Sequence, residues 1–161
     1  MALDPRRTEA YFALMEAGGL LQLLMEEQCQ RDGDISYLQF FLLARLAQAP
    51  GGRMRMTELA DTVVHSRSGL SYQAGKLEKA ELLRREPSPG DERSVTAVIT
   101  EEGRRRLEQV LPGHVSVVER GMFDVLDDEQ AAALAGTLGV VRDRLRTLVP
   151  SSAERRRRAR D

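Results

Sequence analysis

The segment from residue 52 to residue 103 constrains the fold more than any other part of the chain. Its hydrophobic spacing and turn residues predict a short helix, a second helix and the two strands of a hairpin, at about 56–63, 67–80, 82–86 and 94–99. Thr57 or Arg55 caps the first helix, and Ser66 caps the second. The sequence Pro87-Ser88-Pro89-Gly90 forms the hairpin loop. Two helices in tandem, followed by a hairpin, limit the segment to very few folds.

The second helix of this segment has one apolar side and one polar side. Leu70, Ala74 and Leu77 recur at positions i, i+4 and i+7, and we expect them to face inward. The outward residues are Arg67, Ser68, Ser71, Tyr72, Gln73, Lys76 and Lys79. On an isolated helix, this polar side would be read as an ordinary solvated face. Because the helix lies between a short helix and a hairpin, we instead expect it to enter the major groove of DNA.

Each outward residue type suits a particular contact with DNA. Arg67 can pair with guanine or phosphate, and Tyr72 can pack on a thymine methyl group or bond a phosphate. Hydrogen bonds to bases or phosphates are expected from Ser68, Ser71 and Gln73, and a backbone contact from Lys76. In the hairpin, Arg93 is the expected minor-groove or phosphate contact, oriented by Asp91, with Arg84 and Arg85 as further cations. The alternative for Asp91 and Arg93 is a surface ion pair.

The segments on either side predict association between subunits. Residues 5–31 read as a helix that is apolar on more than one face, weakened or bent at Gly18-Gly19. Helix resumes at about Thr100, with an interruption or bend at Pro112-Gly113, and a last helix opens at Asp127 or Asp128. Both C-terminal segments carry apolar residues spaced by four and three: Leu111, Val115, Val118, Met122 and Val125, then Leu134, Leu138, Val141, Leu145 and Leu148. Such heptad seams can be shared by two copies of the chain.

Composition excludes several classes of protein. The 161 residues contain no long apolar run, no apolar signal core and a single cysteine, so we expect a cytoplasmic protein without a membrane span. The net charge of −1 hides an uneven distribution, because residues 53–106 carry eleven Lys and Arg against nine acids. The Arg-rich tail, 150–161, either touches phosphates or aids solubility. We expect no metal site, since His65 and His114 lack suitably spaced partners. We also expect no cofactor and no catalysis, since the sequence has no glycine-rich phosphate loop and no nucleophile elbow.

The ordered motifs of the central segment resemble those of the MarR (multiple antibiotic resistance regulator) family. They are Thr57-Glu-Leu-Ala60, Ser66-Arg-Ser-Gly-Leu70, Leu77-Glu78, Leu82-Leu83-x-Arg85, Asp91-x-Arg93 and Thr100-x-x-Gly103. The resemblance implies a mainly α winged helix-turn-helix fold with a small β-hairpin wing and N- and C-terminal dimerisation helices. One domain, 1–161, then comprises a DNA-binding region (36–103), dimerisation helices (5–31 and 104–148) and a basic, flexible tail. Glu81, Gly75 and Tyr72 depart from the family pattern.

The resemblance also implies a function and a regulatory site. We expect a homodimer that binds a pseudo-palindromic operator in double-stranded DNA and acts as a repressor relieved by a small, aromatic ligand. A ligand crevice between dimer helices and DNA-binding region would be lined by Tyr11, Met15, Tyr37, Phe41 and Met54, which are otherwise core residues. Cys29 lies too late in the first helix for the thiol sensor known in some relatives, and we expect an ordinary helix residue. The alternative functions are a non-specific architectural DNA binder and a protein-interaction module.

Overall fold

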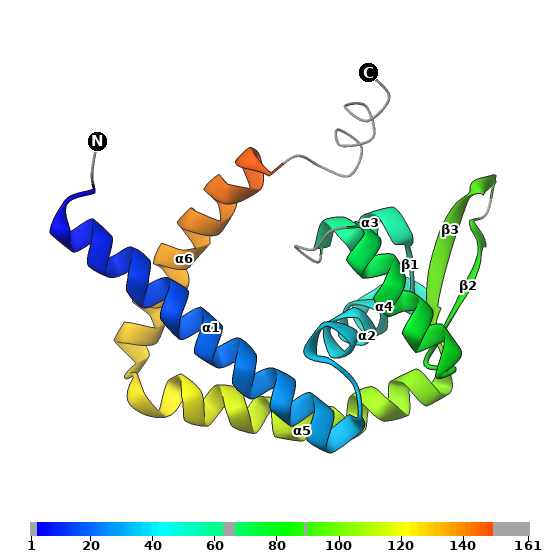
Figure 1. The fold of residues 1–161 in the computed structure, drawn as a ribbon, viewed down its shortest axis with the longest axis horizontal. Helices are drawn as coiled ribbons and strands as arrows, with labels where there is room; N and C mark the ends of the chain where they lie inside the picture. Colours follow the sequence, from blue (N-terminus) through cyan, green and yellow to red (C-terminus); the bar gives the residue numbers. More distant parts are fainter. Residues whose placement is uncertain (1–2, 63–66, 89, 150–161) are drawn as a thin grey trace.

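The helices and strands follow the order that the sequence predicts, with one additional strand. This computed structural model describes residues 3–62, 67–88 and 90–149, apart from the side chains of residues 67–68 and 91–93. The elements are α1 (Pro5–Gly33), α2 (Tyr37–Gln48), η1 (Pro50–Gly52), β1 (Arg53–Arg55), α3 (Met56–Thr62), α4 (Arg67–Lys79), β2 (Leu83–Ser88), β3 (Asp91–Ile99), α5 (Glu101–Gly121), η2 (Phe123–Val125) and α6 (Asp128–Leu148). Figure 1 shows α2, α3, α4 and the sheet grouped on one side, and α1, α5 and α6 extending away from them.

The sheet is larger than the sequence predicts. It is antiparallel, with strand order β1-β3-β2, and the unpredicted strand β1 pairs Met54 with Ala97 of β3. Pro87 pairs with Val95 and Ser88 with Asp91, so the first two residues of the predicted loop 87–90 belong to strand β2. Asp91 and Arg93 therefore belong to β3 and not to a loop. Pro87 is tolerated within β2 because this strand lies at the edge of the sheet, where the missing N–H leaves no ladder bond unmade.

A hydrophobic core holds the helix-turn-helix unit to the sheet. Its buried side chains come from α2, α3, α4, the strands and α5, and include Phe40, Leu42, Leu43, Leu46, Leu59, Leu70, Ala74, Leu77, Leu82, Leu83, Ala97, Ile99 and Val110. From α2 the core takes Phe40, Leu42, Leu43 and Leu46. Ser36 caps α2, since its Oγ accepts from the Gln39 N–H while the Gln39 side chain accepts from the Ser36 N–H.

The two long helices α1 and α5 are each uninterrupted and are clamped together where they meet. α1 runs through Gly18-Gly19, and α5 runs through Pro112, where the sequence suggested a bend or a break. Gln28 Nε2 donates to the Val110 carbonyl oxygen at 3.0 Å, and Gln109 Nε2 donates to the Asp32 carbonyl oxygen at 2.6 Å. These bonds fix the last turns of α1 against α5, and this added packing supports the helix around the proline.

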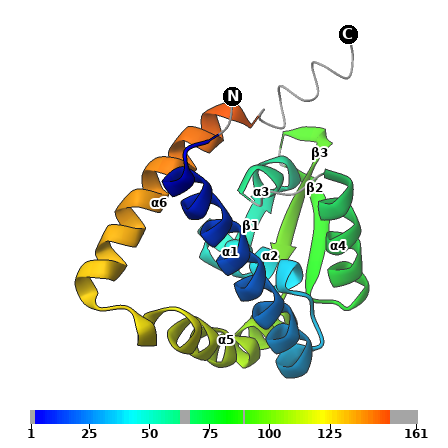
Figure 2. The same cartoon turned by 60° about the vertical axis from the view of Figure 1, so that its left-hand side comes forward.

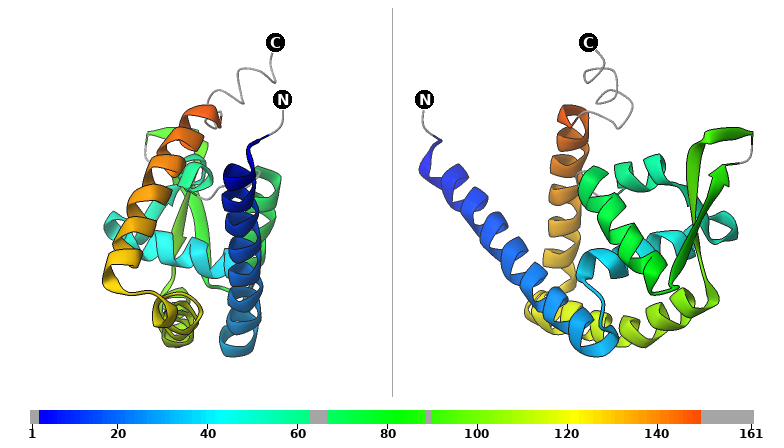
Figure 3. Two further views of the ribbon diagram at one scale, coloured as in Figure 1. Left: turned by 90° about the vertical axis from the view of Figure 1, so that its left-hand side faces the viewer. Right: turned by 45° about the vertical axis from the view of Figure 1, so that its right-hand side comes forward.

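The N-terminal half of α1 and the whole of α6 lie apart from the core. Figures 2 and 3 show α6 leaving the far end of α5, and Figure 1 shows it apart from the sheet and α4. No residue of α6, the whole of which is described, is buried. Large apolar side chains along both helices are exposed: Tyr11, Phe12, Leu14, Met15, Leu20, Leu23, Leu24, Val140, Val141, Leu145 and Leu148. Asp127 caps α6, one of the two predicted caps. Ser66 and the tail 150–161 lie outside the described residues.

Candidate nucleic-acid interface

The exposed side of α4 is the centre of the candidate interface. Leu70, Ala74 and Leu77 are buried, which confirms the predicted inner side of the helix. Ser71, Tyr72 and Lys76 are exposed on the other side, where a base or phosphate could reach them. Arg67 and Ser68 open the helix in sequence, but their side chains lie outside the described residues. The helix therefore presents a short polar surface of the kind that reads base edges.

Two of the outward residues contact each other. The Lys76 ammonium lies 5.4 Å from the centroid of the Tyr72 ring, within the range of a cation–π interaction. Tyr72 is 63% exposed, so its ring remains available to a further partner on its open side. Gln73, predicted as fully outward, is instead half-buried, and its Oε1 has no hydrogen-bond partner among the described groups. This oxygen is itself buried, so the Gln73 side chain would have to turn outward to bond a base.

The end of α4 is fixed by a turn that usually requires glycine. Glu81 adopts a left-handed conformation with φ of 58°, the position at which the sequence departs from the family pattern. The Leu82 N–H donates to the Leu77 carbonyl at 2.9 Å and the Glu81 N–H to the Glu78 carbonyl at 3.0 Å, the bonds of a Schellman motif. Thr100 Oγ1 donates to the Glu81 carbonyl at 2.7 Å. The turn thus joins α4 directly to β2 and the start of α5.

Among the described side chains of the sheet, Arg53, Arg84 and Arg85 are each paired with a glutamate. Arg85 donates from Nε to Glu78 Oε2 at 2.8 Å, and its backbone N–H donates to Glu78 Oε1 at 3.2 Å. Arg84 and Arg53 both form ion pairs with Glu86. The Arg85 guanidinium, hydrogen-bonded to Glu78, holds the pKa of that carboxyl below its usual value. The sequence predicted Arg84 and Arg85 as further cations of the wing, but it did not indicate that Glu78 pairs with Arg85.

The structure separates the five residues predicted to line a ligand crevice. Tyr11 and Met15 are exposed on the N-terminal half of α1, where Tyr11 packs edge-to-face against Phe12. Tyr37, Phe41 and Met54 are partly buried against the core around α2. Within one chain the two groups lie at opposite ends of α1 (Figure 1).

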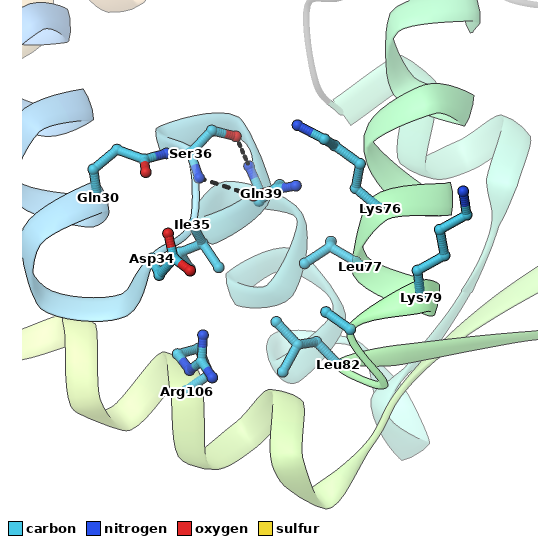
Figure 4. Close-up of a pocket in the computed structure, with 11 residues that line it drawn as sticks. Gln30, Asp34, Ile35, Ser36, Gln39, Lys76, Leu77, Lys79, Leu82 and Arg106 are labelled. Carbon is cyan, nitrogen blue, oxygen red and sulfur yellow. Dashed lines mark hydrogen bonds between the residues drawn. The ribbon is translucent and has the colours of Figure 1, made fainter.

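A groove lies elsewhere, between α4 and the junction of α1 with α2 (Figure 4). Its volume is about 530 Å³, and none of the five predicted ligand residues lines it. Its lining residues are Gln30, Asp34, Ile35, Ser36, Gln39, Lys76, Leu77, Lys79, Ala80, Leu82 and Arg106. Three of these are cations and one is an acid, so the groove favours anions. No sequence motif marked it, because its residues come from four separated elements.

Comparison with solved structures decides the family. The fold matches that of Sco3205 from Streptomyces coelicolor, a MarR family transcriptional regulator whose crystal structure is a complex with DNA, with a TM-score of 0.84. The two sequences are 36% identical, and the match covers 89% of each chain. The chain belongs to the MarR family. Regulators of this family bind DNA, and the MarR family model matches residues 34–94, which include α4 and most of the wing.

Two relatives from Bacillus subtilis (strain 168) support this MarR assignment. The repressor YetL is 27% identical over 80% of this chain and 76% of its own length. The regulator MhqR is 33% identical, but the match spans 49% of this chain and about half, 54%, of MhqR. In this MarR-family chain, none of the described helices is long and apolar enough to cross a membrane.

Cys29 is buried and His114 is half-buried in this MarR-family fold. Burial raises the pKa of the Cys29 thiol to about 11, with further contributions from Glu26 and Asp32. A thiol that stays protonated at neutral pH is a poor nucleophile, in agreement with an ordinary helix residue. His114 packs on Phe40 with 4.6 Å between ring centroids, and burial lowers its pKa. The predominantly neutral ring therefore acts as part of the aromatic packing between α2 and α5.

Proposed function

We propose that this chain is a dimeric, sequence-specific DNA-binding regulator that represses transcription until a small ligand binds. The observation that carries the proposal is the exposed polar face of α4 beside a wing, in a chain whose α1 and α6 leave large apolar side chains uncovered. A single helix-turn-helix contacts few bases, so two units on a two-fold axis are needed to read a palindrome. The relative YetL is itself named a repressor.

The proposed DNA contacts fall into two groups. From α4 they are Arg67, Ser68, Ser71, Tyr72, Gln73 and Lys76, and from β3 they are Asp91 and Arg93. The α4 group would read base edges or fix the helix by phosphate contacts in the major groove, while Arg93 would hold the neighbouring backbone or minor groove. We place α1, α5 and α6 at the dimer interface, and treat 1–161 as one unit of DNA-binding region, dimerisation helices and tail.

Selection of genomic fragments by the purified protein, followed by sequencing, tests specific recognition. The proposal predicts enrichment of a pseudo-palindrome with half-sites centred about one helical turn, roughly 10 base pairs, apart. Binding without sequence enrichment would overturn the specific regulator in favour of an architectural DNA binder. Failure to bind any duplex at low and moderate salt would favour the protein-interaction module.

The effector part of the proposal rests on the groove beside α4. Lys76, Lys79 and Arg106 would attract an anionic ligand, and a ligand held against α4 can bias the separation of the two DNA-binding units. A preference of roughly 1–3 kcal/mol for the wrongly spaced state suffices to lower DNA affinity noticeably. A panel of small aromatic carboxylic acids should include one that raises the melting temperature and weakens DNA binding. If none does either, the ligand-relieved mechanism fails.

A further inference from the structure

The carboxylate of Glu78 joins the recognition helix to the wing. It accepts from Arg85 Nε at 2.8 Å and from the Arg85 backbone N–H at 3.2 Å, and it also contacts Arg85 Nη2. Glu78 lies in the last turns of α4 and Arg85 in the middle of β2. One carboxylate therefore binds both the main chain and the side chain of a single wing residue. This geometry is more restrictive than that of a simple surface ion pair.

The hydrogen bond from the Arg85 backbone N–H to Glu78 satisfies a donor at the edge of the sheet. β2 is an edge strand, paired only with β3 in strand order β1-β3-β2. The Arg85 N–H points away from β3 and would be left to solvent without the Glu78 carboxylate. Figure 2 shows α4 running beside this edge of the wing. The recognition helix thus fixes the position of the strand on which the wing is built.

Gly75 lies on α4 beside the Arg85 guanidinium. A Cβ atom added at Gly75 would lie 4.0 Å from Arg85 Nη2, whereas no other atom comes within 4 Å. An alanine would fit there, but a longer side chain would compete with the guanidinium for the same surface of α4. The Arg85 side chain therefore crosses α4 beside Gly75 at ordinary contact distance, which leaves room for a residue as small as alanine.

We infer that Glu78 and Arg85 form a brace that sets the angle of the wing against the recognition helix. In this role Arg85 is a positioning residue, and its guanidinium is held by Glu78 instead of by a DNA phosphate. The two DNA-contacting elements, α4 and the hairpin, then approach the duplex as one rigid body. The inference rests on the proposed DNA-binding function, because the angle matters only when both elements meet DNA.

The DNA affinity of Glu78→Gln shows whether Arg85 positions the wing or contacts DNA directly, because the two roles of Arg85 predict opposite changes. If Arg85 reaches phosphate, removal of the Glu78 charge should strengthen binding to every duplex. With the brace, the ratio of specific to non-specific affinity should fall by up to about fivefold in Glu78→Gln and in Arg85→Gln, with no further fall in the double variant. Glu86→Gln removes an equal charge from β2, where Glu86 pairs with Arg53 and Arg84 and not with a residue of α4, and it should leave the ratio unchanged.

The salt dependence of Arg85→Gln gives a second discrimination. If Arg85 only positions the wing, Arg85→Gln should have the same slope of log affinity against log salt as the wild type, since no phosphate contact is lost. A slope shallower by about one unit would overturn the inference and make Arg85 a phosphate contact. An unchanged affinity ratio in both single variants would overturn it equally.

A measurement without DNA tests the brace apart from the proposed function. Residual dipolar couplings of backbone amides report the orientation of β2 and β3 relative to α4 in the free, full-length protein. We expect Glu78→Gln and Arg85→Gln to alter the couplings of the wing strands while those of α2 stay the same. Identical couplings in wild type and variants would overturn the brace. If the wild type bound no duplex, the proposed function would fail while the couplings still decided this inference.

Discussion

At the scale of single residues, the interface depends on a few side chains placed by close local geometry. The sequence predicted which residues of α4 face inward, because a helical period is a strong signal. It could not predict that Arg85 and Glu78 pair, or that Gln73 is half-buried, because both depend on the angle at which β2 passes α4. Pairing across elements is set by tertiary packing, which no local pattern encodes.

Arg93→Ala should weaken binding to specific and non-specific duplexes alike. If Arg93 neutralises a phosphate, its loss also makes the dependence of log affinity on log salt shallower by about one unit. Fluorescence anisotropy titrations at several salt concentrations measure both effects. Arg120→Ala, in an exposed position on α5, is the matched control and should change neither. An unchanged salt slope for Arg93→Ala would contradict the proposed contact.

Glu81→Gly should stabilise the protein by about 1 kcal/mol. A residue with a Cβ is strained in the left-handed conformation that Glu81 adopts, and glycine removes that strain while keeping the Schellman bonds. Chemical denaturation at fixed protein concentration gives the change. Ala80→Gly, one residue earlier and at negative φ, should instead destabilise the protein. Equal effects of the two substitutions would contradict this explanation of the turn.

The raised pKa of the Cys29 thiol should lower the stability of the fold in alkaline solution. Its folded-state pKa of about 11 exceeds the ordinary value of 9.0, so the unfolded state loses its proton first as pH rises. The contribution to stability is complete below pH 9 and declines as pH rises towards 11. The unfolding free energy should fall more steeply over this range in wild type than in Cys29→Ala. Parallel curves would show that the thiol is not shifted.

At the scale of elements, the turn between α4 and β2 positions the wing. The sequence predicted the hairpin but ended its first strand two residues too early, because a proline at position 87 usually ends a strand. It missed β1, whose three residues are too few to show an alternating pattern and which forms only by pairing with the distant β3. The start of α5 then crosses this turn closely at Gly103.

Gly103→Ala should destabilise the protein by roughly 2 kcal/mol or more. An added Cβ would overlap the backbone carbonyl of Leu82 and press on Ile99, so α5 would have to move away from the turn. Gly75→Ala is the control, since its Cβ meets only ordinary contact and alanine favours helix by up to about 1 kcal/mol. Thermal or chemical unfolding of both variants should show changes of opposite sign. A harmless Gly103→Ala would contradict the described crossing.

At the scale of the whole molecule, the uncovered apolar surfaces of α1 and α6 require explanation. A single sequence indicated this excess of apolar residues, because a helix apolar on several faces must be covered on several sides. The sequence could not indicate which surface covers these apolar side chains, since that depends on how two folded chains pack together. Leu23 is 63% exposed in the single chain, yet it lies in the middle of α1 and not at a frayed end.

Leu23→Glu should weaken the dimer. A carboxylate buried at an apolar interface loses its hydration without gaining a partner, and association should fall by at least tenfold. Gln22→Glu introduces the same charge at the adjacent, exposed polar position and should have a smaller effect. Sedimentation velocity over a range of protein concentrations measures the change. A wild type that stays monomeric at every concentration would contradict the proposed assembly.

The most direct test of the central claim is the binding of purified protein to the DNA upstream of its own gene. Fluorescence anisotropy would compare this duplex with a scrambled one of equal length and composition at two salt concentrations. A sequence-specific regulator that acts on its own gene should bind the upstream duplex tightly, lose affinity as salt rises, and prefer this duplex by a factor of about a thousand or more. Equal binding of the two duplexes, together with no genomic fragment that binds better, would contradict a sequence-specific regulator.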